Sequence, residues 1–90
     1  MTDGTIAQNP DEGASVEVLD CTGLLCPLPI YLASRALLRL GPGERLRVVC
    51  TDPGSLADFP ALATQTGHEL ISAQEAGGTQ TFVLRKGGGR

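Results

Sequence analysis

The tetrapeptide Cys26-Pro27-Leu28-Pro29 determines where the first helix of this chain can begin. Proline is tolerated in the first turn of a helix, because its missing N–H would have no intrahelical partner there. The apolar residues that follow have helical spacing and share one face: Ile30, Ala33, Leu37 and Leu40. We therefore expect a helix from Pro27 to about Leu40, ended by Gly41 in a left-handed conformation and by Pro42.

The rest of the sequence alternates between strand-like and helix-like segments. Alternating apolar residues predict four strands, at 16–20, 45–51, 68–75 and 79–86. A second helix is expected at 55–66, interrupted by Pro60, with Asp58 capping its restart. Ala76-Gly77-Gly78 predicts the turn of a hairpin. The order β-α-β-α-β-β predicts an α/β (α+β) fold, a two-layer sandwich with two helices packed on one face of a four-stranded mixed sheet.

The length and the distribution of charge bound what the chain can be. Ninety residues suffice for one domain and are too few for two cores. We expect a flexible acidic tail over 1–15, a folded domain over 16–87 and a loose C-terminus over 88–90. Three of the ten acidic residues and none of the seven basic ones precede residue 16, so residues 16–90 carry seven charges of each sign. This balance argues against a nucleic-acid-binding module.

The sequence also indicates a compartment. No apolar run is long enough to span a membrane, and the N-terminus lacks the basic and apolar regions of a secretory signal. Three cysteines, an odd number without such a signal, do not predict a disulfide framework. We therefore expect a cytoplasmic monomer with reduced thiols and no membrane partner.

Cys26 is the residue best placed for chemistry. At the start of a helix, or one residue before it, the thiol would lie near unpartnered backbone N–H groups and the positive end of the helix dipole. This setting lowers the pKa of a thiol and favours the thiolate, which is the nucleophilic form. Gly23 permits a tight backbone and Leu24-Leu25 are apolar, which places Cys26 on a loop leaving a strand. The alternative is a small buried hydrophobic residue, as free cysteines often are.

The residues around Cys26 resemble the signature of the TusA (SirA-like) family of small sulfur carriers. The signature residues are Leu19-Asp20, Gly23-Leu24, Cys26-Pro27 and Pro29. Further matches follow in order at similar spacing: Pro42-Gly43-Glu44, Leu46, Asp52-Pro53, Asp58, Pro60, Gly67-His68-Glu69-Leu70, Phe82 and Leu84-Arg85-Lys86. The resemblance covers roughly residues 17–88 and implies the same two-layer fold.

The resemblance implies that Cys26 accepts a sulfane sulfur as a persulfide and relays it to an acceptor protein, as a sulfurtransferase-type carrier. Gly23, Pro27 and Pro29 would support the motif that presents the thiol. The implied partners are a cysteine desulfurase or rhodanese-like donor and an acceptor in tRNA thiolation, molybdenum-cofactor assembly or sulfur oxidation. Leu28 stands where tRNA-thiolation members often carry an acidic residue, so the acceptor is not specified. No cofactor is implied beyond the covalent sulfur, and the sequence shows no obvious general base beside Cys26.

The other two cysteines lead to different expectations. Cys50 alternates with Leu46 and Val48, which predicts an inward, structural side chain. Cys21 is expected on the same exposed loop as Cys26, where it could resolve a persulfide or form a disulfide. A Cys21/Cys26 thiol pair would make the chain a small redox-sensing or regulatory protein, although the C-x4-C spacing is not the redox C-x-x-C arrangement.

Five polar residues have a structural and a functional interpretation. Arg35 and Arg39 lie off the apolar helix face, either as solvated surface or as docking residues for an acidic partner. Arg35 also matches a basic position in the first helix of the family. His68 could orient a loop or meet a partner, or it could be a partly exposed structural residue. Asp52 and Asp58 are expected to serve the turn and the helix cap.

Two further classes of protein can be weighed against the sulfur relay. A run of glycines at 87–89 is reminiscent of carriers that end in Gly-Gly and hold sulfur as a C-terminal thiocarboxylate, but Arg90 follows it. Three cysteines and His68 could together bind a metal. Their separations lack the paired spacing of zinc ligands, so no metal site is predicted.

Overall fold

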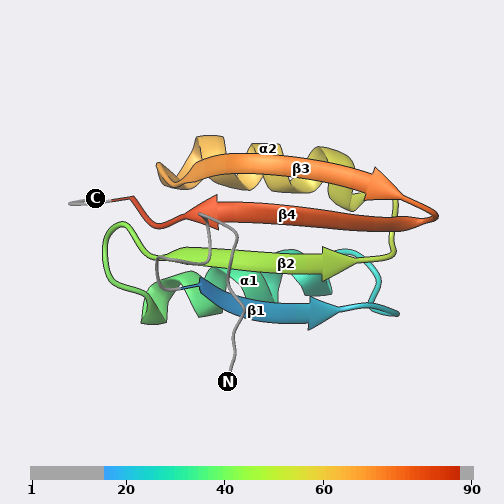
Figure 1. The fold of residues 1–90 in the computed structure, drawn as a ribbon, viewed down its shortest axis with the longest axis horizontal. Coiled ribbons are helices and arrows are strands. Elements are labelled where there is room, and N and C mark those ends of the chain that lie inside the picture. The colour runs from blue at the N-terminus through green and yellow to red at the C-terminus, as the bar shows by residue number, and fades with distance from the viewer. Residues whose placement is uncertain (1–15, 88–90) are drawn as a thin grey trace, which may run out of the picture.

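The computed structural model describes residues 16–87, which form six elements (Figure 1). In chain order these are β1 (Val16–Cys21), α1 (Leu28–Arg39), β2 (Arg45–Cys50), α2 (Ser55–Thr66), β3 (Glu69–Ala76) and β4 (Thr79–Arg85). The order is the predicted β-α-β-α-β-β. The expectations for the tail over 1–15 and for the terminus over 88–90 lie outside the described residues.

The four strands form one mixed sheet in the order β1-β2-β4-β3. β1 and β2 are parallel, and β4 pairs antiparallel with both β2 and β3. Both helices lie behind the sheet in Figure 1, with α1 on β1 and β2 and α2 on β3 and β4. The predicted two-layer sandwich with both helices on one face is confirmed.

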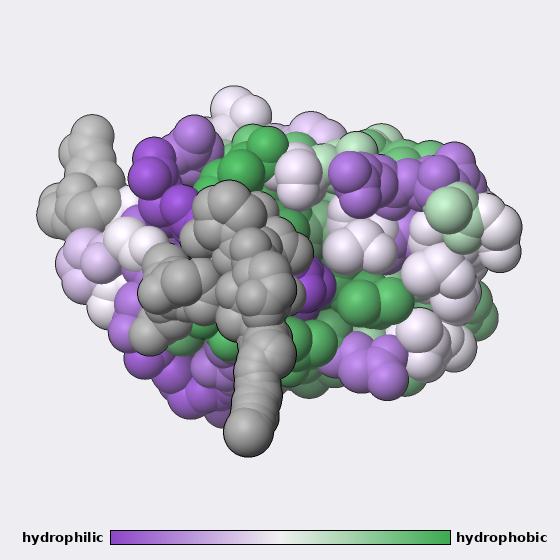
Figure 2. Space-filling view, viewed as in Figure 1, coloured by the Kyte–Doolittle hydropathy of each residue, from purple (hydrophilic) through white to green (hydrophobic). Residues whose placement is uncertain are grey.

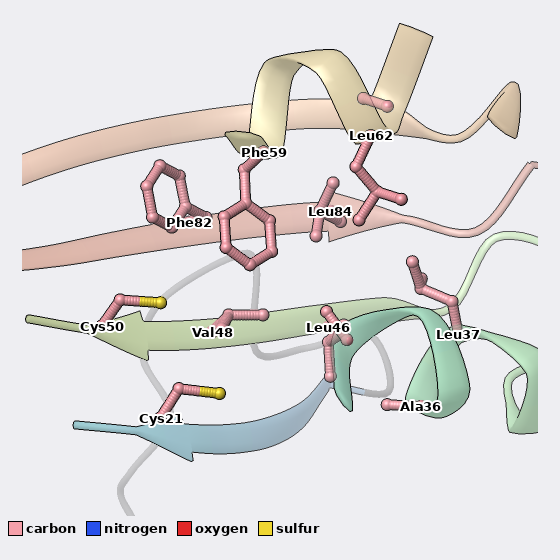
Figure 3. Close-up of a cluster of buried hydrophobic side chains, with 12 residues drawn as sticks. Cys21, Ala36, Leu37, Leu46, Val48, Cys50, Phe59, Leu62, Phe82 and Leu84 are labelled. Atoms are coloured by element: carbon pink, nitrogen blue, oxygen red, sulfur yellow. The ribbon is translucent and has the colours of Figure 1, made fainter. Parts of the chain in front are cut away.

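The hydrophobic core fills the space between the helices and the sheet (Figure 3). Alternate residues of β2 point into it, and Leu46, Val48 and Cys50 are fully buried. Phe59 on α2 stacks against Phe82 on β4, with ring centroids 4.5 Å apart. This aromatic pair joins the second helix to the sheet.

The opposite face of the sheet has no helix over it among the described residues. Figure 2 views the molecule from that side and shows hydrophobic residues beside hydrophilic ones. Val18 on β1 alternates with the core-facing Leu19 and is 60% exposed. The core therefore lies on the helix side of the sheet.

The first helix differs from expectation at both ends. Leu28 begins it and Pro27 is its N-cap, so Pro27 is not the first helical residue as predicted. At the other end, Leu40 is extended, with φ −89° and ψ 151°, and Gly41 is not left-handed. Gly41 N–H instead donates to Glu44 Oε1 at 2.6 Å.

Lys86, just after β4, supplies the end cap that a left-handed glycine was expected to provide. Its Nζ donates to the carbonyl oxygens of Leu37 at 2.5 Å and Leu40 at 3.0 Å. A cation there also interacts favourably with the negative end of the helix dipole. The ammonium thus ties the last strand to the end of α1.

Replacing Lys86 with methionine is expected to lower the free energy of unfolding by about 1 kcal/mol, because the helix carbonyls lose a charged donor. Urea denaturation followed by circular dichroism measures the change. Arg85→Met is the matched control, since Arg85 pairs with Glu69 on the exposed surface, where an ion pair contributes little. Equal destabilisation by both variants would contradict the capping role.

The second helix is continuous through Pro60, so the predicted interruption is wrong. The proline ring removes one donor, to the carbonyl of Leu56, but packing of the buried residues Phe59, Leu62 and Ala63 against the sheet holds the helix together. Asp58 therefore does not cap a restart. The predicted end of this helix at left-handed Gly67 (φ 81°) is correct.

The hairpin between β3 and β4 follows the prediction. Gly77 and Gly78 have φ of 59° and 83°, which is the pair of positive angles that a two-residue hairpin turn needs. This turn sets the register in which Ala76 faces Thr79.

Candidate functional site

Cys26 lies on the loop between β1 and α1, beside the carboxyl ends of the parallel strands β1 and β2. Gly23 in this loop has φ 82°, and its N–H donates to Thr51 Oγ1 at 2.9 Å, which ties the loop to the end of β2. The N–H of Leu28 donates to Leu25 O at 2.9 Å, and the Cys26–Pro27 peptide bond is cis. The thiol of Cys26 is exposed, in agreement with its predicted position on a loop leaving a strand.

Two carboxylates hold Cys26, one at its backbone and one at its sulfur. The N–H of Cys26 donates to Asp52 Oδ2 at 2.8 Å, while Asp52 Oδ1 accepts from Gly54 N–H at 3.1 Å. The thiol donates to Asp58 Oδ2 at 3.2 Å. Asp52 thus serves the turn as expected and also fixes the loop, whereas Asp58 contacts the sulfur instead of capping a helix.

These contacts reverse the predicted effect on the Cys26 thiol. The hydrogen bond to Asp58, then partial loss of hydration and the negative charges of Asp58 and Asp52, raise the pKa of Cys26 above its ordinary value. Few backbone N–H groups are available to stabilise a thiolate here. Pro27 and Pro29 have no N–H, and the N–H of Leu28 donates to Leu25 O within the loop. In this structure Cys26 is therefore held as a thiol. The hydrogen bonds from Cys26 N–H and Gly54 N–H lower the pKa of Asp52, which keeps it ionised.

A shallow groove of about 230 Å³ lies beside the thiol, between the two helices. Its wall is mostly apolar and carries Asp58 next to the sulfur; the lining residues are Cys26, Pro27, Ile30, Asp58, Ala61, Leu62 and Gln65. Exposed apolar residues flank the thiol in the chain, with Leu25 70% and Leu28 47% exposed. Pro29 is buried in the first turn of α1 and anchors that turn to the core. The arrangement offers an open sulfur that another macromolecule can approach.

The sequence model of the family described as Sulfurtransferase TusA matches residues 17–86. The chain belongs to the TusA family. Its described part therefore coincides almost fully with the family domain, and the resemblance found in the sequence is confirmed. The motif that carries it, from Gly23 to Pro29, forms the loop that presents Cys26 and the start of α1.

Relatives and a solved structure agree with this assignment. The chain is 48% identical over 68 residues to the sulfur carrier protein TusA of Allochromatium vinosum, covering 76% of this chain and 90% of the relative. It is 41% identical over 69 residues to the sulfur carrier protein TusA of Pseudomonas aeruginosa, covering 77% and 87%. The crystal structure of a SirA-like protein from Desulfitobacterium hafniense superposes with a TM-score of 0.70 at 23% identity, covering 80% of this chain and 97% of that one, and shares the fold.

Cys21 of this TusA-family chain is not on the exposed loop, so that prediction is wrong. It is the last residue of β1, pairs in register with Cys50 of β2 and is fully buried. Figure 3 shows both side chains pointing into the core from adjacent strands. Burial, followed by the effects of Cys50 and Asp20, raises the pKa of Cys21 to about 11. The structure therefore separates the buried Cys21 from the exposed Cys26, and the inward position predicted for Cys50 is correct.

The two arginines of α1 are exposed and have partners within the domain. Arg39 Nη2 donates to Glu17 Oε2 on β1 at 2.8 Å, in a surface ion pair. Arg35 lies over the ring of Tyr31 at 5.7 Å from its centroid and donates to its hydroxyl at 3.1 Å. Neither lies among the groove residues. Their docking role stays a prediction.

His68 has a structural partner away from the thiol. Its Nδ1 accepts a hydrogen bond from Gly87 N–H at 3.0 Å, which joins the start of β3 to the end of the described chain. Burial and then the charge of Lys86 lower the pKa of His68, which favours the neutral ring that can accept this bond. This matches the structural interpretation of His68.

Within residues 16–87, no group of three or more histidine, cysteine, aspartate or glutamate side chains is placed to hold a metal ion. No helix in this part of the chain has the length and apolar character needed to cross a membrane.

Sequence reasoning missed the role of Asp58. It contacts Cys26 from an element 32 residues away, so no local pattern reports the pair. A signal for Asp52 was available, because the carboxyl ends of neighbouring parallel strands meet at one edge of a sheet. The loops that follow β1 and β2 carry Cys26 and Asp52, and both leave that edge.

Proposed function

We propose that this TusA-family chain is a sulfur carrier that accepts sulfane sulfur as a persulfide on Cys26 and transfers it to an acceptor protein. The observation that carries the proposal is the exposure of Cys26 on an anchored loop, while Cys21 and Cys50, the other cysteines of the chain, are buried. The relatives named sulfur carrier protein TusA support it.

The transfer is an exchange between sulfur atoms with no net change of redox state. The sulfur of Cys26 attacks the terminal sulfur of a donor persulfide, the sulfur–sulfur bond of the donor breaks, and the donor leaves as a thiol. Cys26 then carries the extra sulfur. Discharge repeats the step with a thiolate of the acceptor attacking the outer sulfur, which restores the Cys26 thiol. No cofactor is required for either step.

The open, shallow groove beside Cys26 supports protein partners instead of a free small substrate. A cysteine desulfurase or rhodanese-like protein would supply the sulfur. An acceptor protein in tRNA thiolation, molybdenum-cofactor assembly or sulfur oxidation would receive it. The alternative of a Cys21/Cys26 redox pair has less support, because Cys21 is enclosed in the core.

Intact-mass analysis after incubation with a cysteine desulfurase and cysteine tests the proposal. The expected result is a gain of one sulfur atom that reductant removes and that peptide mapping assigns to Cys26. A parallel reaction with thiosulfate and a rhodanese covers the second donor class. No gain from either donor, or a gain on Cys21 or Cys50, would overturn the proposal, and the loss of two thiols together on mild oxidation would favour the redox alternative.

A further inference from the structure

We propose that Asp58 is the catalytic base that takes the proton from the Cys26 thiol as the sulfur atom is accepted. This inference rests on the proposed function and deepens it, because it assigns a second residue to the same reaction.

The position of Asp58 is fixed independently of the loop that carries Cys26. Asp58 lies in the first turn of α2, and the adjacent Phe59 is fully buried and stacked on Phe82. Asp58 Oδ2 lies 3.2 Å from Cys26 Sγ, within hydrogen-bonding reach of the reacting atom. Both side chains line the same groove, so an incoming sulfur would meet the thiol while the carboxylate is already in contact with it.

The two carboxylates at the site have separate tasks. Asp52 is occupied by the backbone N–H groups of Cys26 and Gly54, which hold the loop in place. Asp58 directs an oxygen at the sulfur itself. Among residues 16–87, the charged groups that act on the thiol are Asp58 on α2 and Asp52 on the loop before it, and both are acidic. Of the two, Asp58 alone contacts the proton that must leave.

A base is needed because the resting residue is a thiol. The nucleophile in sulfur transfer is the thiolate, yet the carboxylates at this site raise the pKa of Cys26 and oppose its formation. A carboxylate within hydrogen-bonding distance resolves this conflict, since it can receive the proton as the new sulfur–sulfur bond forms. A free thiolate then never has to accumulate beside two negative charges.

The proposed step balances without an added reactant. The proton passes from Cys26 Sγ to Asp58 Oδ2 while Sγ attacks the terminal sulfur of the donor persulfide. The donor sulfur–sulfur bond breaks, and its electron pair leaves with the inner sulfur of the donor. That thiolate takes the proton from Asp58, which returns to the carboxylate. On discharge, the acceptor thiolate attacks the outer sulfur of the Cys26 persulfide, the bond between the two sulfurs breaks, and Cys26 Sγ takes a proton to become a thiol again.

The test compares wild type with Asp58→Asn in two measurements. The first is the pH dependence of iodoacetamide alkylation at Cys26, which reports the pKa of the thiol. The second is the single-turnover rate of sulfur loading from a donor persulfide. Asparagine is similar in shape but cannot take up a proton. We expect alkylation at pH 7 to become several-fold faster, because a negative charge is lost, while loading becomes about 100-fold slower.

The opposite signs of these two effects distinguish a base from a merely electrostatic neighbour. If Asp58 only raises the pKa of Cys26, Asp58→Asn will load as fast as wild type or faster, and the inference is overturned. Loading by the variant should approach the wild-type rate as the pH rises through the pKa of the thiol. Glu69→Gln is the matched control: it removes one negative charge from an exposed ion pair with Arg85, outside the groove, so alkylation and loading should both stay at their wild-type rates.

A measurement on wild type keeps the inference testable even if Asp58→Asn folds poorly. The alkylation profile gives the fraction of Cys26 that is thiolate at each pH. The loading rate at pH 7 should be higher than the rate expected if only that thiolate fraction reacted, and it should rise less steeply with pH than the alkylation rate does. Identical pH dependence of loading and alkylation would overturn the role of Asp58 and leave the carrier function intact. Absence of loading in wild type with both donor classes would instead overturn the proposed function itself.

Discussion

Cys26→Ser is expected to abolish sulfur loading while leaving the fold intact. A serine hydroxyl does not ionise near neutral pH, so it does not attack a donor persulfide. Because Cys26 is exposed, the substitution should change the free energy of unfolding by no more than about 0.5 kcal/mol. Intact-mass analysis with a desulfurase donor measures the loading, and urea denaturation measures the stability.

Cys50→Ala and Cys21→Ala are the matched controls for this prediction. Both remove a thiol that is fully buried, so each should cost about 1 kcal/mol of stability and still load one sulfur atom. If Cys50→Ala remains folded and loses loading as completely as Cys26→Ser does, the assignment of Cys26 is wrong. Full loading of Cys26→Ser would have the same meaning.

The fold could be predicted because its signals are local. Two prolines that must open a helix, alternating residues in β2 and a pair of glycines in the hairpin each act over a few residues. The predictions that are wrong concern residues whose conformation depends on groups far away in the sequence. Gly41 is not left-handed because Lys86, from the far end of the chain, caps the end of α1. Pro60 does not break α2 because burial of Phe59 against the sheet outweighs one missing hydrogen bond.

The site shows the same division between local and distant causes. The exposure of Cys26 follows from the local sequence between Gly23 and Pro29, which forms the loop and the start of α1. The sequence predicts that β1 ends at Asp20, whereas pairing with Cys50 extends the strand by one residue to Cys21. Because side chains alternate along a strand, that of Cys21 then points into the core. The pKa of Cys26 was misjudged for a related reason. Its direction depends on Asp58, and the packing of α2 brings that residue to the sulfur.

Phe59→Ala is expected to have the largest effect on stability in this domain. Phe59 is fully buried, and its ring stacks on Phe82 across the interface between α2 and the sheet. Removing the ring loses its transfer free energy and leaves a cavity, which together lower the free energy of unfolding by about 3–5 kcal/mol. Single domains of this size have only about 4–11 kcal/mol in total, so the variant should lose a large share of its stability.

Urea denaturation checks this expectation, with Leu38→Ala as the control. Leu38 lies on α1 and is 80% exposed, so its truncation should change stability by less than about 0.5 kcal/mol. Phe59→Leu keeps most of the apolar volume and should fall between the two. The substitution also reaches the site, because Phe59 fixes the helix turn that holds Asp58 against Cys26. A Phe59→Ala protein as stable as the control would mean that α2 is held by other contacts, and the fixed position of Asp58 would then need a different cause.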